Sequence, residues 1–179
     1  FSRFRNKDIT FVEIGVLGGG SLFMWRKFFG KSARIIGVDM NPDAKKWKKH
    51  GFEIFIGSQS DEKFWLDFIN VVGKVDIILD DGGHTYDQQI ITTEMLLENI
   101  NDGGIIVVED THTSYMPGFG KRKYSFINYT KKLIDRINSR FSSFSNSKSE
   151  RRVWSIQIYE SIVAFCVNKD ATSIVSSPT

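Results

Sequence analysis

The chain has 179 residues, 41% hydrophobic and 13% aromatic, which is enough for one substantial core, and we expect a single domain over residues 1–179. Its 24 Lys and Arg residues are offset by 21 Asp and Glu residues, so the net charge of +3 favours no nucleic-acid partner. No apolar stretch approaches the roughly 20 residues that span a bilayer, and no signal-peptide centre is present, so we expect no membrane partner and a cytoplasmic location. Because the sequence begins at Phe1 rather than Met, we also expect a piece that is truncated at its N-terminus.

Short apolar runs alternate with amphipathic segments along the chain, which is typical of βα units around a parallel sheet. The expected strands are residues 9–15, 33–40, 52–57, 75–83, 102–110, 153–159 and 161–169. The expected helices are residues 21–30, 41–51, 60–73 with Ser60 as its cap, 85–101 and 124–141, followed by a Ser-rich loop over residues 142–152. The last two strands leave no room for a crossover helix and must form an antiparallel hairpin. We therefore expect an α/β fold, a doubly wound, mostly parallel, Rossmann-like sheet of about seven strands that ends in this hairpin.

Glycines follow the first expected strand in "VEIGVLGGGSL", where they permit a tight turn and a close approach to a ligand. In doubly wound sheets ligands bind at the carboxyl ends of the strands. The G-x-G-x-x-G fingerprint of dinucleotide-binding proteins is not matched. The spacing resembles instead the E-x-G-x-x-x-G turn of S-adenosylmethionine (SAM) methyltransferases, with Glu13, Gly15 and Gly19 as cofactor-binding candidates.

Further cofactor-binding candidates lie at the ends of the second and third strands. Asp39 comes roughly twenty residues after the glycine turn, the separation at which an acid meets a ribose hydroxyl in nucleotide-binding folds. Ser58 and Gln59, in "GSQSD", are candidates for adenine or ribose contacts. Asp80, at the end of the fourth strand, is assigned to the cofactor as well.

Carboxylates end two strands that we expect to be neighbours: Asp81 lies at the end of the fourth, and Glu109 and Asp110 lie at the end of the fifth. Such acids on one sheet edge repel one another unless a cation neutralises them or some are protonated. Oxygen ligands without a Cys cluster favour Mg²⁺, with Mn²⁺ or Ca²⁺ as alternatives, over zinc. His84 stands beside these acids, and an imidazole, whose unperturbed pKa lies near neutrality, suits a general base.

Five segments, "FVEIGVLGGGSLFMW", "GVDM", "GSQSD", "DIILDDGGH" and "VVEDTHTSYMPGFG", together resemble the metal-dependent sugar O-methyltransferases of macrolide tailoring, the macrocin and mycinamicin type. The resemblance runs from about Phe11 to Gly120. Cephalosporin hydroxylase-like and rhamnosyl O-methyltransferases share much of it, so the motifs indicate the chemistry better than the substrate. Ser58 stands where the family usually has an acid, and only ten residues precede Phe11, where family members carry further segments.

The resemblance implies a methyltransferase that takes its methyl group from SAM and acts on a hydroxyl of a sugar or glycosylated natural product. It implies Mg²⁺ on Asp81, Glu109 and Asp110, with His84 as the base. It implies SAM across the glycine turn and Asp39, with the 57–61 loop near the adenine. The acceptor would be a small-molecule sugar or glycoside, and a homo-oligomer is a possible assembly. Tyr115 and Phe119 follow the acids and either line the sugar pocket or pack their loop.

Three other functions compete with this interpretation. An NAD-dependent oxidoreductase on the same fold leaves the carboxylates unexplained and lacks its glycine pattern. A catechol-type O-methyltransferase would share metal and cofactor but methylate a small aromatic diol. A non-catalytic SAM-binding module would keep the fold without turnover.

Overall fold

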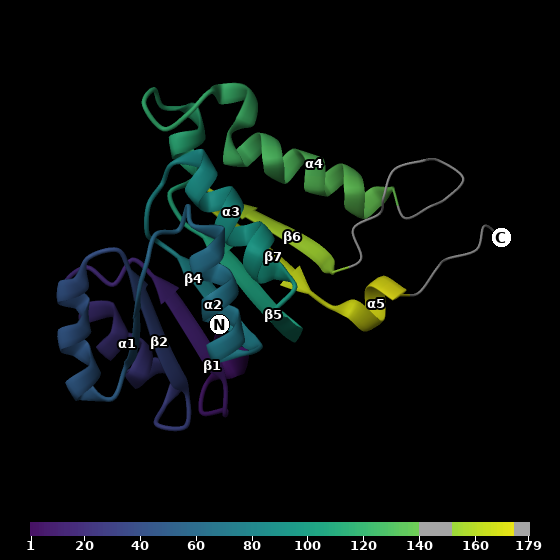
Figure 1. The fold of residues 1–179 in the computed structure, drawn as a ribbon. Helices are drawn as coiled ribbons and strands as arrows, with labels where there is room; N and C mark the ends of the chain where they lie inside the picture. Colours follow the sequence, from purple (N-terminus) through teal and green to yellow (C-terminus); the bar gives the residue numbers. More distant parts are fainter. Residues whose placement is uncertain (140–151, 174–179) are drawn as a thin grey trace.

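The computed structural model describes residues 1–139 and 152–173 and contains a seven-stranded sheet. The strands lie in the order β3-β2-β1-β4-β5-β7-β6. Their bounds are β1 Thr10–Ile14, β2 Arg34–Asp39, β3 Glu53–Ile56, β4 Val75–Asp80, β5 Ile100–Val108, β6 Val153–Tyr159 and β7 Ile162–Val167. The pairs among β1 to β5 are parallel, whereas β7 pairs antiparallel with both β5 and β6. This confirms the predicted mostly parallel sheet with a C-terminal hairpin (Figure 1).

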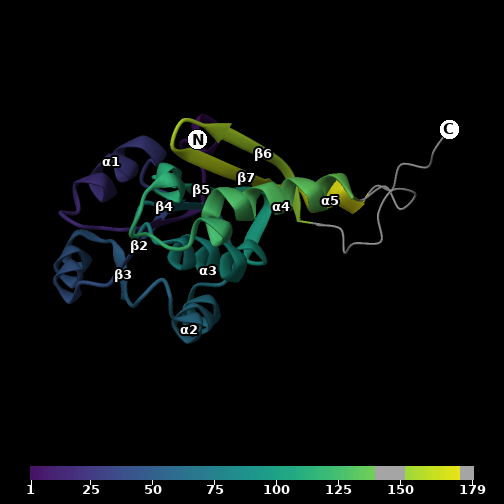
Figure 2. The same cartoon turned by 90° about the horizontal axis from the view of Figure 1, so that it is seen from above.

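Helices cover both faces of the sheet (Figure 2). The α-helices are α1 Gly20–Phe29, α2 Glu62–Val72, α3 Tyr86–Leu97, α4 Phe126–Asn138 and α5 Lys169–Ser173; the 3₁₀ helices are η1 Ser2–Phe4, η2 Pro42–His50, η3 Thr111–Tyr115 and η4 Arg122–Tyr124. Figure 2 shows α1 on one side of the sheet and α2, α3 and α4 on the other. No helix among the described residues is long and apolar enough to cross a membrane.

Each face of the sheet has its own hydrophobic core. On the α2 and α3 side, Trp65 and Phe68 pack with apolar strand residues and with Phe126 of α4. On the α1 side, Phe11 and Phe29 are fully buried. Because the five parallel strands are covered on both faces, their sequences are nearly continuous apolar runs, and polar residues occur where the strands end.

Several expected boundaries are wrong by one to a few residues. Asp61, not Ser60, caps α2, because its carboxylate accepts a hydrogen bond from Lys63 N at 2.9 Å. Helix α3 ends at Leu97 rather than at residue 101, and β5 already begins at Ile100, because residues 100 and 75 pair ahead of a register shift in the β4–β5 ladder. The expected Ser-rich loop lies outside the described residues except for its last residue.

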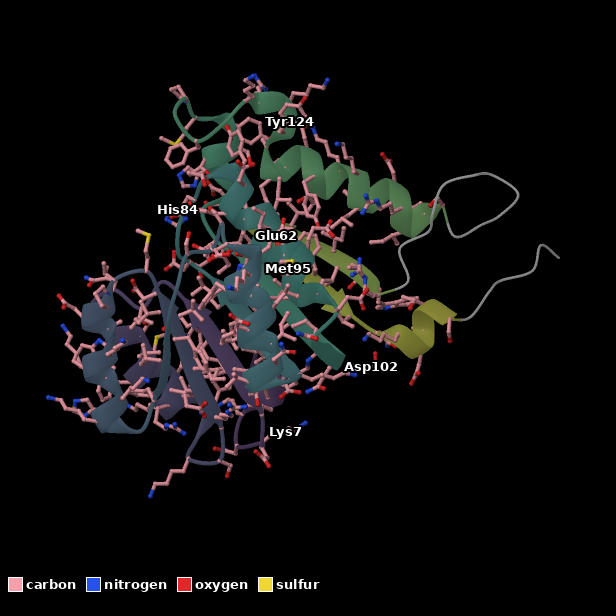
Figure 3. All side chains as sticks on the ribbon, in the orientation of Figure 1. Lys7, Glu62, His84, Met95, Asp102 and Tyr124 are labelled. Carbon is pink, nitrogen blue, oxygen red and sulfur yellow. The ribbon has the colours of Figure 1, made fainter. Side chains whose placement is uncertain are left out.

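The strand order reverses between β1 and β4, so the loops that follow these two strands diverge and leave a crevice at their carboxyl ends. Figure 3 shows His84 at this end of the molecule, with Lys7 and Asp102 at the opposite end. The predicted site residues all belong to the strand ends and loops on the His84 side.

Candidate active site

A cavity of about 460 Å³ lies at the carboxyl ends of the strands. Among the predicted site residues, those that line it are Gly15, Asp39, Gln59, Asp81 and His84. The loops after β1, β2, β3 and β4 therefore all contribute to one cavity. Leu17 and Met40, which sequence reasoning did not single out, also line it and expose 91% and 72% of their surface.

The glycine turn owes its shape to two close approaches. Gly15 has φ +93, and a Cβ there would collide with the backbone of Asp81. Gly19 has φ +73, precedes α1 as its N-cap, and a Cβ there would collide with the indole of Trp47. Both positions require glycine in conformation and in space. Gly15 thus brings β1 against the β4 loop, whereas Gly19 packs the turn on η2, away from the residues that line the cavity.

Asp39 holds the glycine turn in place. Its Oδ2 accepts hydrogen bonds from Val16 N at 3.0 Å and Leu17 N at 2.9 Å, and its Oδ1 accepts one from Asn41 N at 2.8 Å. The sequence predicted an acid at the cavity, and the structure places it there. It also shows that the carboxylate organises the loop around it.

Glu13 faces α1 and does not line the cavity. Its Oε2 accepts from Ser21 Oγ at 2.9 Å and its Oε1 from Trp25 Nε1 at 3.0 Å. Burial, opposed by these two hydrogen bonds, raises the pKa of the Glu13 carboxyl to about 7. These contacts attach α1 to β1, which keeps the glycine turn between them in position.

The loop after β3 carries Ser58 and Gln59. Ser58 Oγ accepts a hydrogen bond from Ser60 N at 3.3 Å within its own turn. Gln59 is buried, and its Nε2 donates to Asp80 Oδ1 at 2.7 Å. Asp80 is buried as well, and burial raises its pKa to about 7. Asp80 therefore lies beneath the cavity wall.

Asp81, His84 and Asp110 form a cluster at the cavity. One ligand atom from each lies within 4.8 Å of the others, an arrangement that could hold a metal ion. His84 Nε2 is 3.4 Å from Asp110 Oδ2. Asp110 has φ +52, a conformation that non-glycine residues rarely adopt. The sequence predicted that these three residues meet, and the structure brings them together.

Glu109, the third predicted metal ligand, is not in that cluster. Burial raises its pKa, and the negative charges of Asp81 and Asp110 raise it further. Burial likewise raises the pKa of Asp81, and the negative charge of Asp110 raises it further, whereas His84 lowers it. Glu109 therefore lies within the electrostatic reach of both acids, and its role as a ligand stays a prediction.

Two polar residues that sequence reasoning missed hold this cluster. Thr113 Oγ1 donates to His84 O at 3.1 Å and is 2.9 Å from Asp110 O, so η3 is tied to the His84 loop. Gln89 is 1% exposed, and its Nε2 donates to Glu109 O at 3.0 Å. Neither has a local sequence signal, because each binds a backbone carbonyl far along the chain.

Tyr115 and Phe119 do not line the cavity. Tyr115 is 62% exposed with the guanidinium of Arg122 over its ring, and Phe119 O accepts a hydrogen bond from Tyr86 N at 3.1 Å.

A doubly wound sheet with a tight glycine turn after β1, an acid after β2 and a cavity at the switch point defines a nucleotide-cofactor-binding α/β protein. A model of the methyltransferase domain matches residues 12–111. The chain belongs to this methyltransferase family, and its sheet is the Rossmann-like methyltransferase fold.

The chain is also similar to named O-methyltransferases. The chain is 32% identical over 149 residues to 8-demethyl-8-alpha-L-rhamnosyl tetracenomycin-C 2'-O-methyltransferase of Streptomyces olivaceus, covering 77% of this chain and 39% of the relative. It is 30% identical over 183 residues to mycinamicin VI 2''-O-methyltransferase of Micromonospora griseorubida, covering 90% of this chain and 44% of the relative. The chain thus spans less than half the length of these relatives.

A solved structure shares the fold closely. The MycE methyltransferase from the mycinamycin biosynthetic pathway, in complex with Mg, SAH and mycinamycin VI, superposes with a TM-score of 0.90 at 27% identity. The match covers 100% of this chain and 49% of that one.

Proposed function

We propose that this protein is a SAM-dependent, divalent-metal-dependent O-methyltransferase that acts on a hydroxyl of a sugar or glycosylated natural product. The observation that carries the proposal is the cluster of Asp81, His84 and Asp110 at a cavity formed by the glycine turn and the strand ends. A base and two carboxylates beside a cofactor-sized cavity suit transfer to an oxygen nucleophile.

Support for the cofactor comes from the cavity and from the relatives. Gly15 lets the β1 turn approach the cavity closely, and Asp39 lines it at the end of β2, where a ribose would lie. Gly19, Glu13 and Asp80 shape this region from behind, and Ser58 lies in the loop proposed to face the adenine. The MycE structure was solved with SAH, the demethylated form of the cofactor.

Support for a metal comes from the donor set. Asp81, Asp110 and the adjacent Glu109 offer carboxylate oxygens, and burial, with repulsion from the neighbouring acids added to it, raises the pKa of Asp81 and of Glu109. Oxygen donors of this kind fit Mg²⁺, and Mn²⁺ as a substitute. Because Mg²⁺ prefers oxygen, we assign the three carboxylates as ligands and leave the His84 imidazole to proton transfer. When bound, the ion supplies positive charge that lowers the pKa of an acceptor hydroxyl.

The remaining chemistry belongs to residues of this chain. His84 accepts the proton of the acceptor hydroxyl on a ring nitrogen, and the Asp110 carboxylate, 3.4 Å from Nε2, stabilises the imidazolium that results. Thr113 fixes the His84 backbone and thereby the direction of the ring. The acceptor oxygen then forms a bond to the methyl carbon as the sulfur–methyl bond breaks, so a sulfonium becomes a thioether and the acceptor becomes a methyl ether.

The test is methyl transfer from radiolabelled SAM to glycosides, with Mg²⁺ and with EDTA, in parallel with a catechol acceptor. We expect label in the glycoside with Mg²⁺, loss of transfer in EDTA, and a roughly 100-fold or larger fall in kcat for His84→Gln. Transfer to the catechol alone would replace the sugar assignment by the catechol-type one. SAM binding without transfer to any acceptor would favour a non-catalytic module, and no binding of SAM would contradict the proposal.

A further inference from the structure

The side chain of Gln59 joins three elements at the wall of the cavity. Its Nε2 donates to Asp80 Oδ1 at the end of β4 at 2.7 Å and lies 3.2 Å from Thr92 Oγ1 of α3. Its Oε1 accepts a hydrogen bond from Gly83 N at 2.5 Å. Both ends of the amide are therefore occupied by protein groups, and the residue is 6% exposed.

The backbone of Gln59 is also fixed from the core. The indole Nε1 of Trp65, a fully buried residue of α2, donates to Gln59 O at 2.9 Å. A side chain with a fixed backbone and occupied donors and acceptors cannot turn toward a ligand without leaving buried polar groups unpaired. The adenine or ribose contact expected for Gln59 would carry that cost.

The two glycines of "DGGH" fit this arrangement. A Cβ on Gly82 would collide with Oε1 of Gln59, and a Cβ on Gly83 would collide with the side chain of Gln88. A side chain at either position would therefore displace the end of one of these glutamines from its place against the β4 loop. The packing of the β4 loop against Gln59 and Gln88 thus explains why glycines suit positions 82 and 83.

The loop held in this way carries the reactive groups. Asp81 is tied to β1 by its N–H, which donates to Ile14 O at 3.0 Å, and His84 is tied to η3 by Thr113. Between them, Gly83 is tied to Gln59. The hydrogen bond from Gly83 N to Gln59 links the middle of this loop to the β3–α2 loop on the cofactor side of the cavity.

We propose that Gln59 is a positioning residue, which sets the Asp81–His84 loop through Gly83 and Asp80, and that it makes no polar contact with the adenine. The inference rests on the proposed function, because Asp81 and His84 are the groups being positioned. Gln59, which the sequence indicated as a cofactor contact, would thus align the proposed cation site at the end of β4.

The test compares Gln59→Met, which keeps the length of the side chain and removes its hydrogen bonds, with Thr92→Val, which removes only the 3.2 Å contact. Mn²⁺ and SAH affinities are measured separately by calorimetry, and thermal unfolding reports the stability of each variant. We expect Gln59→Met to weaken Mn²⁺ about tenfold or more, as loss of an outer-sphere partner does, and SAH less than threefold. We expect Thr92→Val to bind both like the wild type.

A loss of SAH affinity equal to or larger than the loss of Mn²⁺ affinity would overturn the inference and restore Gln59 as an adenine contact. If the wild type binds neither SAH nor Mn²⁺, the proposed function itself fails. The two failures are therefore distinguishable in one set of titrations.

A measurement on the wild type keeps the inference testable if Gln59→Met does not fold. Hydrogen exchange followed by NMR should show the Gly83 amide protected about 100-fold or more in the metal-free protein, because Gln59 accepts its proton. Exchange at the rate of an open loop would overturn the inference.

Discussion

The two sides of the cavity use their carboxylates differently. On the side of β1 and β2, Glu13 and Asp39 accept five hydrogen bonds in total from protein donors: two to Glu13 and three to Asp39. On the side of β4 and β5, Asp81 and Glu109 face other acids, and burial together with the negative charge of those acids raises the pKa of both. The first side is a scaffold already complete within the protein, whereas the second has negative charge to offer a cation.

The two sides of the cavity therefore serve different functions. Approach to the cofactor depends on backbone geometry, which Gly15 permits and Asp39 maintains. Binding of a cation depends on charge that the fold leaves uncompensated. Substitutions on the two sides should therefore have separable effects, on stability for the first and on ligand affinity for the second.

The largest expected effect is on the cation side. Asp81→Asn removes a charged oxygen ligand and should lower Mn²⁺ affinity by at least about 100-fold, measured by calorimetry or by the free-ion signal in electron paramagnetic resonance. Stability should be unchanged or slightly increased, because a like charge beside Asp110 is removed. Asp67→Asn, an exposed acid on α2, is the matched control. Equal Mn²⁺ affinity in both variants would show that the cation site lies elsewhere.

The next effect is on the scaffold side. Gly15→Ala places a Cβ against the Asp81 backbone at φ +93 and should lower the free energy of unfolding by about 3 kcal/mol, measured by urea titration. Gly18→Ala is the control, because a Cβ there meets no atom within 4 Å and φ is not in the left-handed region. A similar cost for both variants would mean that the turn does not pack on the β4 loop as described.

A smaller effect concerns pH. The folded-state pKa of Glu13, about 7 against an ordinary 4.5, means that the folded protein binds this proton more tightly than the unfolded chain. The contribution to stability is therefore present at low pH and is lost as pH rises from about 4.5 through 7. Glu13→Gln, measured in EDTA, should gain roughly 2 kcal/mol relative to the wild type between pH 5 and pH 8. Glu160→Gln, at an exposed residue of the β6–β7 turn, should show no such change. If the stability of Glu13→Gln relative to the wild type does not change between pH 5 and pH 8, the result contradicts the raised pKa of Glu13.

The sequence was sufficient for the architecture because periodicity and strand ends are local properties. It placed Asp81, His84 and Asp110 at one sheet edge, since neighbouring parallel strands end together. It did not show that Glu13 turns to α1 or that Gln59 is occupied by Asp80 and Gly83. Those outcomes depend on donors such as Trp25 Nε1, whose distance in space no local pattern encodes.

The central claim is that one cavity holds the cofactor and the cation side by side. The direct measurement is the NMR line width of SAH bound to the wild-type protein as Mn²⁺ is added, with Asp81→Asn as the reference. The account predicts strong paramagnetic broadening of the SAH resonances that disappears in Asp81→Asn. Binding of both ligands without broadening would place them at separate sites and contradict the account.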